Sequence, residues 1–251
     1  DVPSGATLIF SAHGVSKSIR REAETRGLKV FDATCPLVKK VHVEVLKKRA
    51  AGYEIVMIGH DGHPEVEGTM GQSDTGMYLI ESEDQVEGLT VRNPDRLAYV
   101  SQTTLSVDDT QRIIAALRAR FPNIEGPKQD DICYATQNRQ DAVKAMAPEV
   151  DVVIVVGSRN SSNTNRLTEL SLQLGVPTYQ IDSARELDAD WLIGRPRVGV
   201  TSGASAPEVL VQDVIHALQA LGAKTVDELP GVEEAMTFPL PRGLATRSPS
   251  A

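Results

Sequence analysis

Short apolar runs rich in β-branched residues alternate along this chain with stretches in which apolar positions recur at helical spacing. This alternation is typical of parallel sheets whose strands are connected by helices, so we predict an α/β fold. Strands are expected at Thr7–Ser11, Lys29–Asp32, Glu54–Ile58, Met77–Ile80, Leu97–Ser101, Val152–Val156, Thr178–Ile181 and Arg197–Thr201. Helices are expected at Lys17–Thr25, Leu37–Ala50, Val107–Arg120, Gln137–Met146, Asn163–Leu174 and Pro207–Leu221. The run Val152–Val156 is apolar throughout, which indicates a strand buried on both faces.

The pattern repeats within the chain. Cys35 and Cys133 lie 98 positions apart, and 24 residues after each cysteine an expected strand ends at Gly59 or Gly157. The segment 99–106 matches the segment 199–206, and both lead into a long helix. A third copy, 9–16, matches the segment 99–106 at an offset of 90. Repetition at a fixed period indicates duplicated structural units.

The spacing of the copies predicts how the chain is divided. The copy at 9–16 resembles the end of a repeat, so we expect a third cysteine upstream of Asp1 and a first domain that is largely missing. The expected parts are a C-terminal remnant of the first α/β domain (1–35), a second α/β domain (36–129), a third (130–221) and an extended tail (222–251). Residues Thr246–Ala251 are expected to be disordered.

Composition limits the possible functions. The net charge of -8 leaves no basic surplus for general binding to nucleic acid or to an anionic membrane. Two cysteines do not make a disulfide framework, which favours a reducing compartment and a cytoplasmic location. No apolar run approaches the ~20 residues of a membrane span, and no signal-peptide pattern precedes the first expected strand.

Candidate chemistry collects where the expected strands end, which is where open parallel sheets place their ligands. Residues at such ends are His13, Cys35, His63, Thr103, Cys133, Ser161, Ser162, Asn163 and Ser205. Three-fold repetition would direct the three sets toward one central axis.

Each cysteine precedes a helical pattern, and the positive end of a helix dipole favours the thiolate. Three converging thiolates form the smallest shell for a [4Fe–4S] cluster with one open iron. A zinc ion held by Cys35, Cys133, His13 and His63 is the competing reading, although no compact zinc spacing is present. Taken singly, each cysteine could instead be a small buried hydrophobic residue.

The loop Gly157–Arg166 is polar and enters a helix, so its hydroxyls, amide side chains and backbone N–H groups suit a diphosphate. Ordinary N-capping by Ser or Asn is the alternative, and Ser205 adds a hydroxyl from an equivalent loop. No Walker or GxGxxG motif supports ATP or NAD.

The segment His60–Gly68 contains two histidines and two carboxylates, which could bind an anion and deliver a proton. A solvated surface loop is an equally good reading for Glu65 and the better one for Glu67. His13 lies between Ser11 and Ser16 at a strand end, which favours a role in the site.

These segments together resemble the LytB family, the 4-hydroxy-3-methylbut-2-enyl diphosphate reductases of non-mevalonate isoprenoid synthesis. The matching segments are 10–16, 32–38, 59–71, 102–109, 131–136, 157–166 and 201–207. The resemblance implies three pseudo-repeated α/β domains in a trefoil around a central site. It implies an iron–sulfur enzyme in which Cys35 and Cys133 ligate a [4Fe–4S] cluster held by three cysteines in the complete protein.

The same resemblance implies roles for the remaining residues. His13, His63, Thr103, Ser161, Ser162, Asn163 and Ser205 would contact the substrate. Glu65, with Thr103, would supply protons for a two-electron reduction that releases water and gives isopentenyl and dimethylallyl diphosphate. Ferredoxin or flavodoxin would supply the electrons.

This sequence departs from the family in one respect. The family's first cysteine and another substrate-binding histidine belong to an N-terminal segment that this sequence does not contain. We therefore expect the isolated chain to hold no stable cluster and to reduce substrate poorly. The alternatives are a catalytically inert diphosphate-binding fragment and a zinc hydrolase that uses His63 and Glu65.

Overall fold

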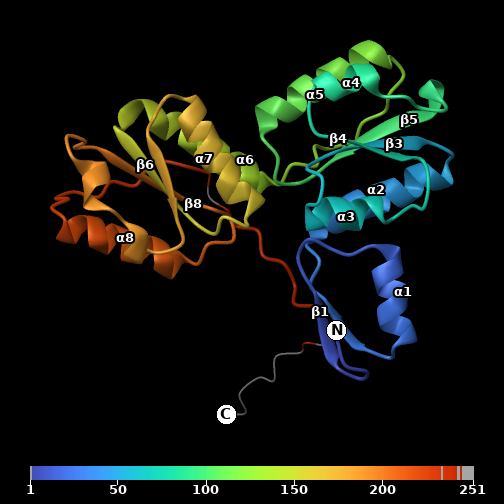
Figure 1. Cartoon of the computed structure of the whole chain (residues 1–251), viewed down its shortest axis with the longest axis horizontal. Coiled ribbons are helices and arrows are strands. Elements are labelled where there is room, and N and C mark those ends of the chain that lie inside the picture. The colour runs from blue at the N-terminus through green and yellow to red at the C-terminus, as the bar shows by residue number, and fades with distance from the viewer. Residues whose placement is uncertain (1, 233, 242–243, 245–251) are drawn as a thin grey trace. The chain divides into compact units, whose positions relative to one another are not determined.

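The computed structural model describes residues 2–232, 234–241 and 244, and it confirms the alternation of strands and helices (Figure 1). The strands are β1 (Thr7–Phe10), β2 (Lys29–Asp32), β3 (Glu54–Ile58), β4 (Met77–Ile80), β5 (Leu97–Ser101), β6 (Val152–Val156), β7 (Thr178–Ile181) and β8 (Val198–Ser202). The α-helices are α1 (Lys17–Thr25), α2 (Pro36–Ala50), α3 (Pro64–Met70), α4 (Asp84–Gly88), α5 (Val107–Arg120), α6 (Tyr134–Met146), α7 (Ser162–Gln173) and α8 (Glu208–Ala220). Short 3-10 turns are η1 (Pro94–Arg96), η2 (Ala147–Glu149), η3 (Ala184–Glu186) and η4 (Ala189–Leu192).

Within the described residues, the strands form three separate sheets, and every strand pairing is parallel. The sheet orders are β1-β2, β4-β3-β5 and β7-β6-β8, so the two larger sheets share one topology. The registers also correspond, because Ile55 pairs with Ala98 of β5 just as Val153 pairs with Gly199 of β8. The sheet topology therefore confirms the internal repeat and the α/β fold class.

Backbone contacts divide the chain into two compact units. Unit 1 contains the described residues of 1–103, 108–131 and 235–251, and unit 2 contains those of 104–107 and 132–234. The finer division at 35, 129 and 221 stays a prediction.

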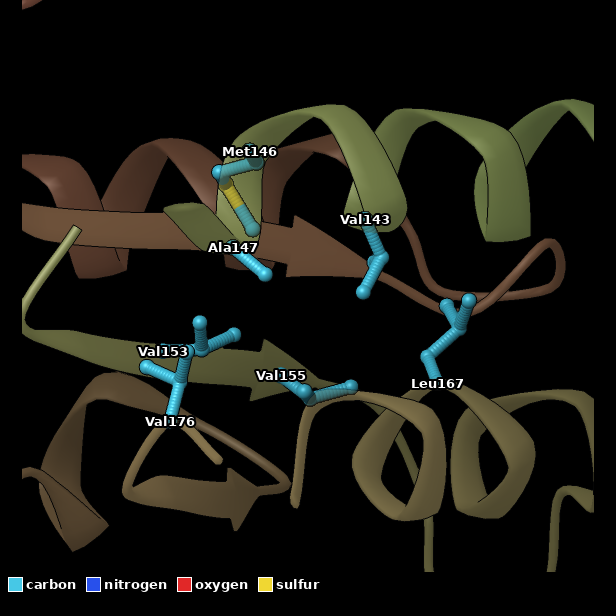
Figure 2. Packing of buried hydrophobic residues seen from close by; sticks show 7 residues of the cluster. All are labelled: Val143, Met146, Ala147, Val153, Val155, Leu167 and Val176. Carbon is cyan, nitrogen blue, oxygen red and sulfur yellow. The ribbon is translucent and has the colours of Figure 1, made fainter. Parts of the chain in front are cut away.

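The core of unit 2 surrounds β6, whose five residues are all buried. Val153 and Val155 pack against Val143 of α6 and Leu167 of α7, as Figure 2 shows. Ile154 and Val156, which point to the opposite face, belong to a second cluster with residues of α8. Successive residues of a strand point to opposite faces, so a strand covered on both sides has to be apolar throughout.

Unit 1 repeats this construction around β3, which is also buried along its whole length. Ile55 and Met57 pack with Val41 and Val45 of α2 and with Val66 of α3. Helices α2 and α3 lie side by side next to this sheet (Figure 1). The strands thereby hold the N-terminal ends of both helices near the carboxyl edge of the sheet.

Several element boundaries differ from the sequence prediction. Strand β1 ends one residue early and β8 is displaced by one residue, while β2 to β7 match. Helix α6 begins at Tyr134, not at Gln137, and α2 begins at Pro36. Helix α3 was not predicted, because its seven residues include Pro64 and Gly68 and are too few to show a helical period.

The structure describes only part of the C-terminal stretch, which the sequence predicts to be extended. From 223 onward the described residues contain no helix or strand. The expected disorder of 246–251 lies outside the described residues. Within the described part of the chain, no helix is both long enough and apolar enough to cross a membrane.

Candidate functional site

Both cysteines stand immediately before a helix, as the sequence predicted. Cys35 is the N-cap of α2, and its carbonyl oxygen accepts a hydrogen bond from the N–H of Lys39 at 2.9 Å. Cys133 is the N-cap of α6, and the N–H groups of Thr136 and Gln137 donate to its carbonyl oxygen at 2.9 Å. Both thiols are free and half-buried. The local backbone thus places each sulfur at the positive end of a helix dipole.

A carboxylate fixes the turn that leads to Cys35. Asp32 accepts a hydrogen bond from the N–H of Thr34 at 3.0 Å and one from Arg20 at 3.1 Å. Partial burial disfavours the charge, but these hydrogen bonds and the charge of Lys39 outweigh it and lower the pKa of Asp32 to about 2. The turn is therefore held by a carboxylate that is ionised at neutral pH.

His13 and His63 meet within unit 1. Their ring centroids are 5.4 Å apart and the rings are nearly perpendicular. His63 caps α3, and its Nδ1 accepts a hydrogen bond from the N–H of Glu65 at 3.2 Å. Burial, together with the charges of His13 and His60, lowers the pKa of His63 to about 4. His63 is therefore neutral at pH 7, with its proton on Nε2, which can donate to a ligand.

Glu65 is a buried carboxyl that is hydrogen-bonded to Thr103, and Thr103 follows the carboxyl end of β5. Its Oε1 accepts from the N–H of Thr103 at 2.7 Å, and its Oε2 accepts from Oγ1 of Thr103 at 2.9 Å. Burial raises the pKa of Glu65 to about 7, the charge of Asp131 adds to this effect, and the two hydrogen bonds oppose it. Because Glu65 is only 2% exposed, the surface-loop reading of this residue is wrong. Glu67 is exposed, as expected.

Asp131 is a second buried carboxyl, to which the sequence reading assigned no role. Its Oδ2 accepts from the N–H of Ser101 at 3.1 Å, and its Oδ1 lies 3.4 Å from Nζ of Lys40. Burial raises the pKa of Asp131 to about 6, although these two partners act in the opposite direction. The available sequence signal was an acidic residue shortly before a cysteine, as Asp32 stands before Cys35.

The start of α7 carries the polar loop of unit 2. Ser161 is the N-cap, and its Oγ accepts from the N–H of Thr164 at 3.4 Å, so the capping alternative is confirmed for this residue. Oγ of Ser162 lies 2.9 Å from Oγ1 of Thr104. Asn163 is 4% exposed, yet neither polar atom of its amide has a hydrogen-bond partner among the described residues. Buried amides are almost always paired, so this one is available to a ligand.

The repeat explains why the amide of Asn163 is unpaired. At the offset of 98 that relates the two cysteines, Asn163 corresponds to Glu65. At the offset of 100 that relates the segments 99–106 and 199–206, Gly203 corresponds to Thr103. Glu65 accepts hydrogen bonds from the N–H and the hydroxyl of Thr103, whereas Gly203 has no side chain that could bond to Asn163. A Cβ atom on Gly203 would lie 2.1 Å from Oγ1 of Thr164, so the end of β8 lies directly against the start of α7. The turn from Gly203 to Ala206 also carries the exposed Ser205.

The predicted residues therefore fall into two local groups. Unit 1 holds His13, Cys35, His63, Glu65 and Thr103, and unit 2 holds Cys133, Ser161, Ser162, Asn163 and Ser205. Among the described residues, no three or more His, Cys, Asp or Glu side chains are grouped to hold a metal ion. The predicted common pocket and the zinc site stay predictions.

In both units, side chains that can bind an anion or exchange a proton gather at the carboxyl ends of parallel strands. Enzymes with α/β folds place their active sites at these strand ends, so the fold and its polar groups are those of an α/β enzyme. The model of the LytB protein family matches residues 1–219. The chain belongs to the LytB family.

Individual relatives agree with this assignment. A 4-hydroxy-3-methylbut-2-enyl diphosphate reductase of Ralstonia nicotianae is 66% identical over 244 residues, covering 97% of this chain and 75% of the relative. A reductase of the same name from Aromatoleum aromaticum is 64% identical over 246 residues, covering 98% of this chain and 79% of the relative.

Solved structures agree as well. The E-1-hydroxy-2-methyl-but-2-enyl-4-diphosphate reductase from Plasmodium falciparum superposes with a TM-score of 0.89 at 38% identity, over 96% of this chain and 76% of that protein. A second structure, described as the terminal enzyme of the non-mevalonate pathway, matches with a TM-score of 0.56 at 37% identity, over 85% of this chain and 76% of that protein. The family resemblance expected from the sequence is confirmed.

Proposed function

We propose that this chain acts in the reduction of 4-hydroxy-3-methylbut-2-enyl diphosphate to isopentenyl and dimethylallyl diphosphate. The observation that carries the proposal is the 66% identity to a reductase of that substrate over 97% of the chain. The allylic C–O bond breaks, two electrons and two protons enter, one hydrogen ends on carbon and the hydroxyl leaves as water. The chain must therefore bind a diphosphate, accept electrons and supply protons.

Cys35 and Cys133 would ligate an iron–sulfur cluster of the [4Fe–4S] type. Both are free, half-buried thiols at helix starts, and thiolates are the usual cluster ligands, so the donor chemistry fits. A shell of three thiolates would need one thiolate from outside these 251 residues, since the sequence has two cysteines. When bound, the cluster would supply electrons and a Lewis-acidic iron for the substrate oxygen. A ferredoxin or flavodoxin would be the electron donor.

Glu65 and Thr103 would deliver the protons. A carboxyl with a pKa of about 7 is close to half protonated at neutral pH, which suits a group that must both give and regain a proton. Oγ1 of Thr103 is hydrogen-bonded to Oε2 of Glu65 at 2.9 Å. When Glu65 is protonated, the hydroxyl can accept from the carboxyl and donate onward to a substrate oxygen. Thr103 would thus contact the substrate directly.

The diphosphate would be bound by neutral donors. Asn163 offers an unpaired buried amide at the start of a helix of twelve residues, where backbone N–H groups also favour an anion. Ser161, Ser162 and Ser205 add hydroxyls from the same edge of the sheet in unit 2. In unit 1, His63 offers Nε2–H next to His13, so both histidines would contact the substrate.

Exogenous thiol provides a test of the cluster assignment. The chain is reconstituted anaerobically with iron and sulfide, with and without a small thiol that can act as a third ligand. We expect stable iron binding and cluster absorption only with the thiol, and their loss in Cys35→Ser and in Cys133→Ser. Ser183→Ala, which is remote from either cysteine in the sequence, is the control variant and should bind iron and sulfide as the wild type does. Equal iron and sulfide in the wild type and both cysteine variants would contradict the assignment.

Turnover tests the reaction itself. Reduced methyl viologen serves as the electron donor, and consumption of substrate and formation of the two products are measured on the thiol-supported chain. Glu65→Gln is expected to lose most of the activity, whereas Glu67→Gln keeps it, because Glu67 is exposed and Glu65 is buried against Thr103. A chain that holds the cluster and forms neither product would contradict the proposed reaction.

A second candidate function is diphosphate binding without turnover, and the unpaired amide of Asn163 is the observation that favours it. Calorimetry with isopentenyl diphosphate separates the two readings. Binding that Asn163→Leu abolishes, in a chain that shows no turnover with cluster and thiol, would support this candidate. Absence of heat from the wild type would remove it.

A further inference from the structure

The segment that follows His13 packs closely on α3, at two glycines that leave no room for side chains. A Cβ atom on Gly68 would lie 3.2 Å from the carbonyl carbon and oxygen of Gly14. A Cβ atom on Gly71 would lie 2.2 Å from Cβ of Ser16. The backbone after His13 therefore lies directly against the helix whose N-cap is His63.

One buried side chain joins the two segments. Gln72 is 7% exposed and follows the C-terminal end of α3. Its Nε2 donates to the carbonyl oxygen of Val15 at 2.9 Å and to that of Gly68 at 2.7 Å. The N–H of Lys17 also donates to the carbonyl oxygen of Gly71 at 3.1 Å. One hydrogen of the amide thus anchors the side chain on α3 at Gly68, and the other reaches the turn after His13 at Val15.

The geometry of the histidine pair depends on this connection. His13 is exposed and lies on a turn, so its position relative to His63 is set by whatever holds the turn against α3. Close approach at the glycines is compatible with sliding, because packing at glycine is not directional. The hydrogen bond from Nε2 of Gln72 to Val15 and the one from the N–H of Lys17 to Gly71 are directional, and together they fix the turn at one register along the helix.

We propose that Gln72 is a positioning residue that holds the turn after His13 on α3, so that His13 and His63 present their rings together to the diphosphate substrate. The part that concerns substrate rests on the proposed function. The part that concerns the histidine pair rests on the distances alone. Gln72 itself does not touch the substrate.

The test compares Gln72→Met, Gln72→Glu and Tyr78→Phe in the full 251-residue chain. Met has a similar length and no donor, and Glu turns an acceptor toward two carbonyl oxygens. Tyr78→Phe is the matched control, because it removes one 3.0 Å hydrogen bond to Glu54 in the same unit without touching the His13 turn. Nuclear Overhauser signals between the two histidine rings are measured without ligand, and calorimetry then measures binding of isopentenyl diphosphate.

The Overhauser signals between the rings should disappear in Gln72→Met and Gln72→Glu and persist in Tyr78→Phe. Binding should weaken about tenfold in Gln72→Met, which corresponds to the loss of one aligned ligand interaction. His13→Ala should weaken binding in the wild type and in Tyr78→Phe, but should add little in Gln72→Met, because the histidine is already misplaced.

Overhauser signals that survive in Gln72→Met would overturn the proposal. If the signals vanish in Gln72→Met while the wild type binds no diphosphate, the positioning role is supported and the proposed function is contradicted, so the two failures are distinct. If Gln72→Met does not fold, Gln72→Asn takes its place. Its amide is one methylene shorter and cannot reach both carbonyl oxygens, and the same two outcomes apply.

Discussion

Replacement of Glu65 by Gln should change how the stability of the protein depends on pH. The pKa of Glu65 is raised from 4.5 to about 7, so the folded state binds this proton more tightly than the unfolded state. The resulting stabilisation is fully present below pH 4.5 and is lost as the pH rises through about 7. The shift is equivalent to ~3 kcal/mol at ~1.4 kcal/mol per pKa unit.

Gln cannot ionise, so Glu65→Gln should not show this loss. Near pH 5 the free energy of unfolding should be within ~1 kcal/mol of the wild type, because the Gln amide can replace the hydrogen bonds with Thr103. At pH 8 the variant should be more stable than the wild type by up to ~3 kcal/mol. Urea unfolding followed by circular dichroism from pH 5 to pH 8 measures the difference.

Two internal references make the experiment specific. Glu67→Gln alters an exposed carboxyl on the same helix and should leave the pH dependence unchanged. Fluorescence of Trp191, which lies in unit 2, should show little difference between Glu65→Gln and the wild type. Parallel stability curves for the wild type and Glu65→Gln would show that Glu65 is ionised throughout, and would refute the raised pKa and with it the proton-delivery role.

Three further predictions follow from single contacts. Thr103→Val removes a hydrogen bond that favours the ionised carboxylate, so the pKa of Glu65 should rise above about 7. Carbon NMR of the Glu65 carboxyl measures the titration midpoint, and a lower midpoint in the variant would contradict the prediction. Asn163→Leu replaces an unpaired buried amide, so the free energy of unfolding measured by calorimetry should increase by ~1 kcal/mol while binding of isopentenyl diphosphate is lost. A lower melting temperature in the variant would contradict this prediction. Gly203→Ala places a methyl group against Thr164 and should destabilise unit 2 by ~1–3 kcal/mol, measured by Trp191 fluorescence during unfolding. Gly231→Ala, which has open space in the same unit, should not, and equal effects of the two changes would rule out the close contact.

The repeat was readable because it depends on local patterns. Strands β3 and β6 are apolar along most or all of their length and are buried on both faces, and the matching segments follow at nearly constant spacing. The helices after Cys35 and Cys133 were expected for the same reason. Their exact starts were missed because a cysteine, and not a Ser, Thr, Asp or Asn, occupies the N-cap position of each helix and its side chain makes no capping hydrogen bond.

Glu65 shows where sequence reasoning stops. Chemistry alone left it evenly balanced between a site and a surface loop, and the family resemblance favoured the site. The deciding contact is with Thr103, which lies 38 positions away, and the raised pKa of Glu65 comes from its burial and from the charge of Asp131, 66 positions away. Helix α3 itself was not predicted, because its seven residues are too few to show a helical period, and the turn after His13 that packs against it is distant in the sequence.

The sequence by itself determined the α/β class, the duplicated units, the family and the cysteines at helix starts, since each depends on residue type and spacing along the chain. Only the tertiary structure decided that Glu65 is a buried, partly protonated carboxyl, that Asn163 keeps an unpaired amide, and that Gln72 connects the His13 turn to α3. Protonation and hydrogen-bond pairing depend on groups brought together from distant positions, and a one-dimensional pattern does not contain those distances.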